Sequence, residues 1–263
     1  MFKNFHQILY SNQAIVQQRN QPWWVIVVLY LLSAMLISTP FIAEGYRLSS
    51  STLASTFEPV ASLFDQAIQE DCVIEENVLS CSFEEVKTFT EGDYTLYLNE
   101  SDDASLNDLD NYLLLSKNYV FGLVDGQSVV GMYNLANVGP LSNLKTSGMS
   151  SAMILGDFLE NAHKGALPVR VPMIYALNVF QYLVYILVVA LVLRFVNGRQ
   201  FTLNLSFKEA LAIAVMTMFA PALISAIIGL FNPSIATLFY PVAYMARIVL
   251  VYWQIMKLQR STN

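Results

Sequence analysis

Four long stretches that are almost free of charge limit the fold of this chain more than any other feature. Residues 23–43 read WWVIVVLYLLSAMLISTPFIA and contain no charged residue. About 20 such residues, rising 1.5 Å each, cross the roughly 30 Å hydrocarbon layer of a bilayer. Residues 171–193, 210–231 and 235–256 form three further stretches of this kind, and only the last holds a charge, Arg247. The sequence therefore predicts an α-helical membrane protein with about four transmembrane helices.

The first stretch has to be distinguished from a cleaved secretion signal. The apolar part of such a signal is 7–15 residues long and ends at small residues before the cleavage site. Here the apolar stretch is longer, and Phe41 stands where a small residue would precede cleavage after Ala43. We expect a retained membrane anchor.

The distribution of charge predicts the orientation. Lys and Arg beside a span resist translocation, so the segments that hold them stay in the cytoplasm. Segments 1–22, 194–209 and 257–263 together hold seven Lys or Arg and one acid, whereas residues 44–170 hold 19 of the 20 acids and have a net charge of −13. We expect a multi-pass cell-membrane protein with both termini cytoplasmic and residues 44–170 outside. An acidic surface repels phosphate, which excludes nucleic acid as a partner.

Residues 44–170, inserted between the first and second spans, have the pattern of a small α+β domain. Apolar residues recur at helical spacing over 49–68, and this helix is expected to follow the first span after a break near Pro40. Five short strands follow, with Asp125-Gly126 as a two-residue hairpin turn between the last two. An amphipathic helix over 150–163 is expected to stop at Gly165 and Pro168. The strands are expected at 86–90, 94–98, 112–115, 119–124 and 128–133.

The two cysteines, Cys72 and Cys81, both lie in this acidic domain. If Glu76-Asn77 is a two-residue turn, Cys72 faces Cys81 at a non-hydrogen-bonded position, where two antiparallel strands approach most closely. A disulfide fits there and suits an oxidising exterior. The alternative is two unpaired small apolar side chains. Two cysteines without further ligands nearby are too few for a structural zinc site.

Arg247 is the intramembrane residue with the most obvious functional potential, because a cation there usually faces a partner or a cavity. The structural interpretation is an ion pair with Glu209 or a side chain that extends to the interface. The functional interpretation is a substrate or ion site, which Pro221 and Pro241 would favour because broken helices free backbone carbonyls. Asn178 and Gln181 in the second span complete this candidate polar site, although both also suit hydrogen bonds between helices.

The N-terminal segment 1–22 places Phe2, Phe5, Ile8 and Leu9 on one helical face. This pattern predicts a short amphipathic helix that lies along the inner leaflet and fixes the first span.

Motifs of catalysis are absent from the sequence. Neither of the two histidines, His6 and His163, belongs to an H-E-x-x-H pattern, and there is no G-x-S-x-G, P-loop or dinucleotide-binding motif. His163 is interpreted as a cation near the C-terminus of its helix. The acidic runs do not match an EF-hand loop, so a solvated acidic face is preferred over a calcium site. We expect no enzyme activity, no metal and no cofactor.

The opening MFKNFHQILYSNQAIVQQRNQPWWVIVVLYLLSAMLISTPF and the closing FQYLVYILVVALVL and SFKEALAIAVMTMFAPALISAII resemble a family of bacterial four-span membrane proteins of unknown function. Some members are labelled maltodextrin-utilisation proteins. The resemblance implies a Gram-positive cell membrane, an extracellular domain and a genetic link to sugar-uptake systems. It implies no catalytic residues.

Three functions are compatible with this sequence. The first is a non-enzymatic accessory or sensor protein whose external domain binds a partner or ligand and whose spans contact another membrane protein or a second copy. The second is a transporter or permease subunit with a site near Arg247, which with four spans would need a partner or an oligomer. The third is an intramembrane enzyme, for which a paired nucleophile and base are missing.

Overall fold

The computed structural model describes residues 6–101, 110–133, 139–145, 148–200 and 205–260. The chain divides into two compact units. We call residues Met1–Gly45 and Val171–Asn263 the helical unit, and residues Tyr46–Arg170 the α/β unit. The two are linked covalently at 45/46 and at 170/171, and each is described by itself.

Four helices have the length and the apolar composition needed to cross a membrane. They are α3 (Trp23–Arg47), α6 (Ser151–Gln200), α7 (Phe207–Gly229) and α8 (Pro233–Arg260). The apolar part of α6 corresponds to the second predicted span, and the connector between α7 and α8 is as short as expected. Two short helices, α1 (Gln7–Tyr10) and α2 (Asn12–Gln17), precede α3. The chain therefore has the four apolar helices that its sequence predicts.

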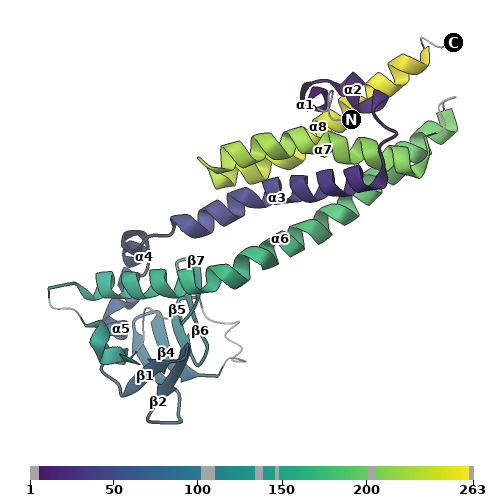
Figure 1. The fold of residues 1–263 in the computed structure, drawn as a ribbon. Coiled ribbons are helices and arrows are strands. Elements are labelled where there is room, and N and C mark those ends of the chain that lie inside the picture. The colour runs from purple at the N-terminus through teal and green to yellow at the C-terminus, as the bar shows by residue number, and fades with distance from the viewer. Residues whose placement is uncertain (1–5, 102–109, 134–138, 146–147, 201–204, 261–263) are drawn as a thin grey trace. The chain divides into compact units, whose positions relative to one another are not determined.

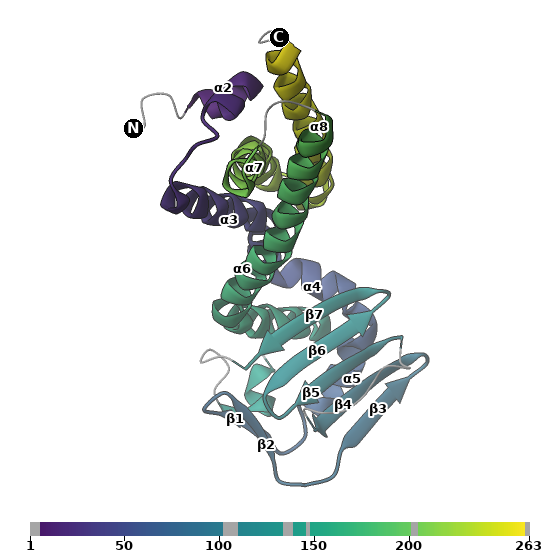
Figure 2. The same ribbon diagram turned by 90° about the vertical axis from the view of Figure 1, so that its right-hand side faces the viewer.

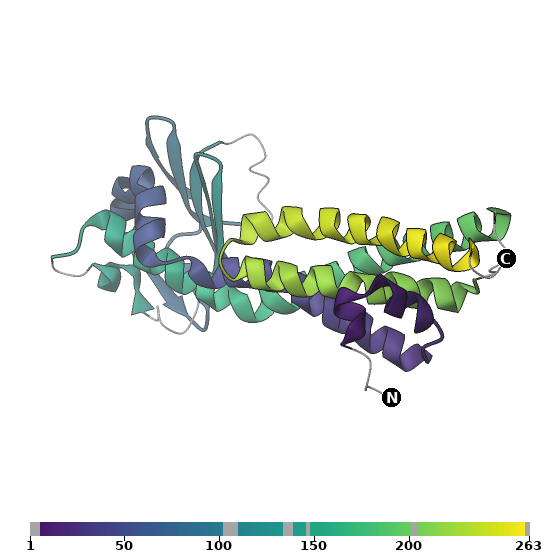
Figure 3. The ribbon, with the colours of Figure 1, turned by 90° about the horizontal axis from the view of Figure 1, so that it is seen from above.

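The helical unit is organised around α7, which is buried along most of its length. Its neighbour α8 runs back beside it as an antiparallel hairpin, and α1 and α2 pack against this pair (Figure 3). Apolar residues of α3, α6 and α8 complete one core with α7. By contrast, only 22% of the apolar window of α6, and of that of α8, is buried.

One close approach fixes α3 against α7. Gly229 lies so near Pro40 that an added Cβ would stand 2.4 Å from the Pro40 Cγ atom. Pro40 does not interrupt α3, which continues to Arg47, so the expected break near Pro40 is wrong. A proline removes one backbone hydrogen bond, and packing against a neighbouring helix compensates for it within an apolar span.

The α/β unit contains two small sheets (Figure 2). The larger has the order β3-β4-β5-β6-β7, and all of its neighbouring strands are antiparallel except the parallel pair β4 and β5. The smaller has the order β2-β1-β8. The strand bounds are β1 Cys72–Glu75, β2 Val78–Cys81, β3 Lys87–Glu91, β4 Tyr94–Glu100, β5 Tyr112–Ser116, β6 Tyr119–Val124, β7 Gln127–Met132 and β8 Gly139–Pro140. The five strands expected from the sequence correspond to β3 through β7.

Both two-residue turns predicted from the sequence are present. Glu76 and Asn77 have φ values of 51° and 67°, and Asp125 and Gly126 have φ values of 50° and 75°. Positive φ at both central residues matches the right-handed twist of the strands that such a turn joins. The first turn pairs Glu75 with Val78, and the second pairs Val124 with Gln127.

Helices cover one face of the larger sheet (Figure 2). They are α4 (Ser50–Thr56), the 3₁₀ turn η1 (Glu58–Val60), α5 (Ala61–Ala67) and the first turns of α6. The expected single helix over 49–68 is therefore three pieces. Pro59 follows the end of α4, and because it lacks an N–H it cannot continue that helix. The core beneath contains, among others, Phe57, Phe64, Leu96, Leu113, Val120 and Phe158.

The helix expected over 150–163 does not stop at Gly165 and Pro168. It continues without a break through the second apolar stretch, and the whole of α6 is 50 residues long. Pro168 lacks the N–H that would bond the carbonyl of Lys164, but the loss of one bond does not end a helix of this length. His163 is consequently in the interior of a helix, and the prediction that it lies near a helix C-terminus is wrong.

Candidate functional site

Arg247 on α8 is surrounded by oxygen acceptors from its own chain. Its Nη2 atom donates to the carbonyl of Leu9 at 3.1 Å and also to that of Ile8. Its Nε atom donates to Asn12 Oδ1 at 3.3 Å. Ile8 and Leu9 belong to the short helix α1, whose last carbonyls have no intrahelical partner. The guanidinium therefore caps α1 and holds the corner between α1 and α2 against α8.

A fourth acceptor explains why Arg247 reaches toward α7. Its Nη1 atom lies 3.4 Å from the carbonyl oxygen of Thr217. In an α-helix that carbonyl would accept from the residue four positions later, which is Pro221 and has no N–H. A free carbonyl in an apolar interior is costly, so Arg247 satisfies an acceptor that the proline leaves open. Arg247 and Pro221, which the sequence suggested for a substrate or ion site, are linked in the structure through the Thr217 carbonyl of the chain itself.

Glu209 does not pair with Arg247 as the sequence suggested. Its carboxylate accepts from the backbone N–H and the hydroxyl of Ser206, which in turn accepts from the Glu209 N–H, and so forms a capping box at the start of α7. Its other oxygen lies 2.9 Å from Arg19 Nε. Glu209, in the first turn of α7, is held by its own cap, and the cation that pairs with it is Arg19, which follows α2. The expected ion pair between Arg247 and Glu209 is therefore wrong.

The N-terminal segment packs against other helices of the helical unit. Ile8 and Ile15 are fully buried, and Ala14 and Val16 nearly so. Helices α1 and α2 contact α7 and α8, and Arg19 ties the end of the segment to α7. The apolar face expected for this segment is therefore covered, within residues 6–18, by other helices of the chain. Phe2 and Phe5 lie outside the described residues.

Asn178 links α6 to α3. Its Nδ2 atom donates to Ser38 Oγ at 3.0 Å, and both side chains are buried. Tyr30 on α3 donates its hydroxyl to the carbonyl of Val179, and Tyr175 donates to that of Leu31 at 3.3 Å. Three polar contacts thus join these two helices. Hydrogen bonds between helices are a common source of association within a bilayer.

Gln181 follows Asn178 by three residues on α6 but, in the described part of the chain, makes no hydrogen bond with it or with the other two residues of the predicted polar site. It is exposed and has no hydrogen-bond partner among the described residues. It borders an open groove of about 480 Å³ between α6 and α8. The lining residues are Gln181, Tyr182, Val184, Tyr185, Val188, Thr237 and Pro241. The structure therefore gives Arg247, Glu209 and Asn178 three separate sets of partners and leaves Gln181 without one, so no polar contact within the described structure joins the four residues.

A cluster of three tyrosines, which was not predicted from the sequence, begins at the wall of this groove with Tyr182. Tyr182 packs edge-on against Tyr240, with ring centroids 5.2 Å apart, and Tyr240 stacks on Tyr244 at 6.0 Å. The buried hydroxyl of Tyr240 has no hydrogen-bond partner in the described structure. Tyr240 and Tyr244 are four residues apart on α8, and this spacing, which is visible in the sequence, places two side chains on the same face of a helix.

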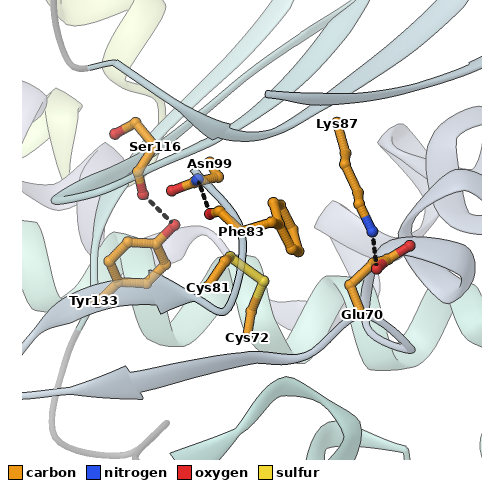
Figure 4. The surroundings of a disulfide bond; sticks show 8 residues. All are labelled: Glu70, Cys72, Cys81, Phe83, Lys87, Asn99, Ser116 and Tyr133. Carbon is orange, nitrogen blue, oxygen red and sulfur yellow. Dashed lines mark hydrogen bonds and ion pairs between the residues drawn. A yellow bond between two sulfur atoms is a disulfide. The ribbon is translucent and has the colours of Figure 1, made fainter. Parts of the chain in front are cut away.

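Cys72 and Cys81 form a disulfide, as expected (Figure 4). The register of β1 and β2 pairs Cys72 with Cys81 and Val73 with Ser80, in agreement with the register predicted from the Glu76-Asn77 turn. The two Cα atoms are 4.0 Å apart, which suits a non-hydrogen-bonded antiparallel pair. The bridge closes the hairpin of β1 and β2, and both of these strands belong to the smaller sheet.

Polar contacts around the bridge hold the chain that leaves β2 (Figure 4). Asn99 Nδ2 donates to the carbonyl of Phe83 at 2.9 Å. Lys87 pairs with Glu70, and its Nζ atom lies 4.2 Å from the centroid of the Phe83 ring. These contacts connect the segments on either side of the disulfide hairpin with β3 and β4.

The remaining candidate residue, His163, is buried, and its Nδ1 atom lies 3.2 Å from the carbonyl oxygen of Val130 on the edge strand β7. Gly131 allows this approach, since an added Cβ would stand 2.6 Å from Ala162. Among the residues that the structure describes, no group of three or more His, Cys, Asp or Glu side chains is placed to hold a metal ion.

Comparisons with known proteins give one result. No curated protein and no solved structure matches the chain. A family model, described as a protein of unknown function (DUF1189), matches residues 2–255. This match extends from the N-terminal segment through all four apolar helices and the α/β unit between them in the sequence. The chain therefore belongs to the DUF1189 family of proteins of unknown function.

Proposed function

We propose that this protein is a four-span integral membrane protein that acts as a non-enzymatic accessory or sensor, with the α/β unit as its binding module outside the cytoplasm. The disulfide between Cys72 and Cys81 carries this proposal. Disulfides persist in oxidising compartments and are rare in the cytosol. The basic segments at the ends of the spans support a cytoplasmic position for both termini.

Aromatic residues at the ends of the apolar helices support insertion into a bilayer. Trp23 and Trp24 open α3 and are both 52% exposed, and Trp253 lies near the end of α8 with 54% exposure. Tryptophan is enriched where a bilayer meets water. The start of α3 and the end of α8 lie at the same end of the helical unit (Figure 1), so these three side chains mark one membrane interface, the cytoplasmic one in this proposal.

The surface offered to a partner is the face of the larger sheet opposite its helices. The strand register places Thr88, Tyr97, Leu114, Phe121 and Val130 in one row across this face, in which Leu114 is buried and the other four are at least partly exposed. Phe121 stacks on Tyr112 with ring centroids 5.5 Å apart, and Val130 is 38% exposed. Aromatic and aliphatic side chains with partial exposure are typical of protein-binding surfaces. A link to sugar uptake, taken from the family resemblance, is part of this proposal.

The test is photo-crosslinking from the α/β unit in intact cells. A photoreactive amino acid at Val130 is expected to give a discrete adduct with another envelope protein, and the same group at Glu76, on the tip of the disulfide hairpin, serves as the control. The proposal fails if neither position gives an adduct and gentle solubilisation recovers only the isolated chain.

The transport hypothesis relied on Arg247, Pro221 and Pro241. Because Arg247 and Pro221 meet at the Thr217 carbonyl, their presence in the spans has an explanation that needs no substrate. The deciding variant is Arg247→Leu. Loss of solute uptake in a strain where this variant reaches the membrane in normal amounts would restore transport as the better proposal.

A further inference from the structure

Gln181 is a polar side chain on the exposed apolar side of α6. Its exposed neighbours on this helix are Leu177, Phe180 and Val184, with 58%, 69% and 50% of their surface accessible. Gln181 follows Val171 by ten residues, about 15 Å along a helix, which is half of a hydrocarbon layer of roughly 30 Å. In the proposed bilayer its amide would face acyl chains, which offer no hydrogen bond.

The amide needs a partner that both donates and accepts. A glutamine side chain carries two N–H donors and one carbonyl acceptor, and none of them is used within the described chain. The groove beside it adds another acceptor. Thr237 lines this groove, and its carbonyl would bond the N–H of residue 241, which is a proline and has none.

A second copy of the chain offers the required chemistry at the required depth. All copies of a membrane protein have the same orientation, so Gln181 lies at the same depth in every copy. A two-fold axis along the membrane normal brings Gln181 opposite Gln181, as in any isologous contact. Each amide can then donate to the carbonyl of the other, and the pair forms two reciprocal hydrogen bonds.

The groove also offers a concave surface that a side chain of the second copy can fill. Phe180 is adjacent to Gln181 and is the most exposed large apolar side chain on the segment of α6 that runs from Met173 to Val192. The groove has a volume of about 480 Å³, and Tyr182 and Tyr185 are among its lining residues. An aromatic side chain of a second copy fits such a wall, because offset and edge-on ring contacts are favourable.

We propose that this chain forms a homodimer within the membrane, through the face of α6 centred on Gln181, with the two amides paired and the groove filled by the other copy. This proposal depends on the proposed insertion of the four helices into a bilayer. A lipid-soluble small molecule and a helix of a different protein are the competing occupants, and the test separates them.

The test is disulfide crosslinking of the full chain in its own membranes. Val184→Cys, on the same exposed face of α6 and three residues from Gln181, is introduced with Cys72 and Cys81 left in their bridge, and the control is Val249→Cys, 65% exposed on α8. Mild oxidation is expected to give a dimer at position 184 and to leave the control monomeric. In detergent, Gln181→Leu is expected to weaken dimerisation at least tenfold, and Gln181→Asn to restore part of it.

Equal crosslinking at positions 184 and 249, or none at 184 in a chain that resists alkaline extraction from the membrane, would overturn the dimer. So would a monomer that carries a small molecule lost in Gln181→Leu, or a crosslinked band that contains a different protein. None of these results contradicts membrane insertion. Release of the chain by alkaline extraction would instead overturn insertion, and the dimer with it.

Discussion

The Nη1 atom of Arg247 lies 3.4 Å from the carbonyl oxygen of Thr217, the acceptor that a proline four residues later leaves without a helical donor. One contact therefore accounts for two unusual features of the apolar helices, a cation and a proline. The remaining donors of Arg247 bind α1 and Asn12. Arg247 thus acts as a structural link among α1, α7 and α8.

Replacing Arg247 by methionine is expected to loosen the N-terminal segment. Carbonyls left without a donor in a buried position cost about 1–3 kcal/mol each. Amide exchange over residues 6–18 should rise, and the melting temperature in detergent should fall. Pro221→Ala supplies an N–H for the Thr217 carbonyl, so the double variant should lose less stability than Arg247→Met alone. Equal losses in both would show that Arg247 does not serve that carbonyl.

The ion pair between Arg19 and Glu209 is expected to contribute little. Its side chains are 33% and 22% exposed, and pairs of this kind contribute about 0–1 kcal/mol. Glu209→Gln keeps an acceptor for the Ser206 cap and removes only the charge, whereas Glu209→Ala removes both. The alanine variant should therefore be the less stable one in thermal denaturation. Added salt should narrow the gap between the glutamine variant and the unaltered chain, and a gap that widens would contradict this assignment.

Gly229→Ala tests the contact between α3 and α7. The added methyl group would meet Pro40, whose Cγ, Cβ and Cα atoms are 2.4, 2.7 and 3.0 Å from the ideal Cβ position. Overpacking of this kind costs about 1–3 kcal/mol. The matched control is Ile227→Ala on the same helix, whose side chain is 52% exposed. Thermal unfolding in detergent should show a larger loss for the glycine variant, and the reverse order would refute the close approach.

Loss of the disulfide should destabilise the α/β unit. A bridge that closes about ten residues contributes roughly 2–3 kcal/mol on the chain-entropy model. Cys72→Ser, Cys81→Ser and the double variant should all lose the same amount, because each removes one bond. Additive losses in the double variant would mean that the two cysteines act independently and are not bridged in the cell.

Local patterns predicted much of this fold. The Glu76-Asn77 and Asp125-Gly126 turns determined the strand registers next to them, because a two-residue turn leaves one way to pair its strands. The length of the uncharged stretches of sequence predicted the positions of the four apolar helices. Wrong predictions came from residues that break helices in isolation. Pro40, Gly165 and Pro168 lie within α3 and α6, where tertiary packing and the need to satisfy backbone groups outweigh local preference.

The polar contacts were harder to predict. Arg247 meets Asn12 across 235 positions of sequence, and Glu209 meets Arg19 across 190, so no local pattern connects these partners. The amphipathic face of residues 6–18 was visible in the sequence. Apolar periodicity shows that a face is buried, but not whether lipid or protein covers it. Only the packed helices distinguish those two environments.

The sidedness of the α/β unit is the most direct test of the proposed function. Glu58 is exposed on the helix side of the α/β unit and Lys257 is exposed near the end of α8, so a membrane-impermeant maleimide can compare Glu58→Cys with Lys257→Cys in intact cells. We expect labelling at position 58 alone, and labelling at 257 only after the membrane is permeabilised. Labelling at 257 alone in intact cells would contradict the proposed orientation, and equal labelling at both positions would contradict a membrane-spanning chain with separate sides.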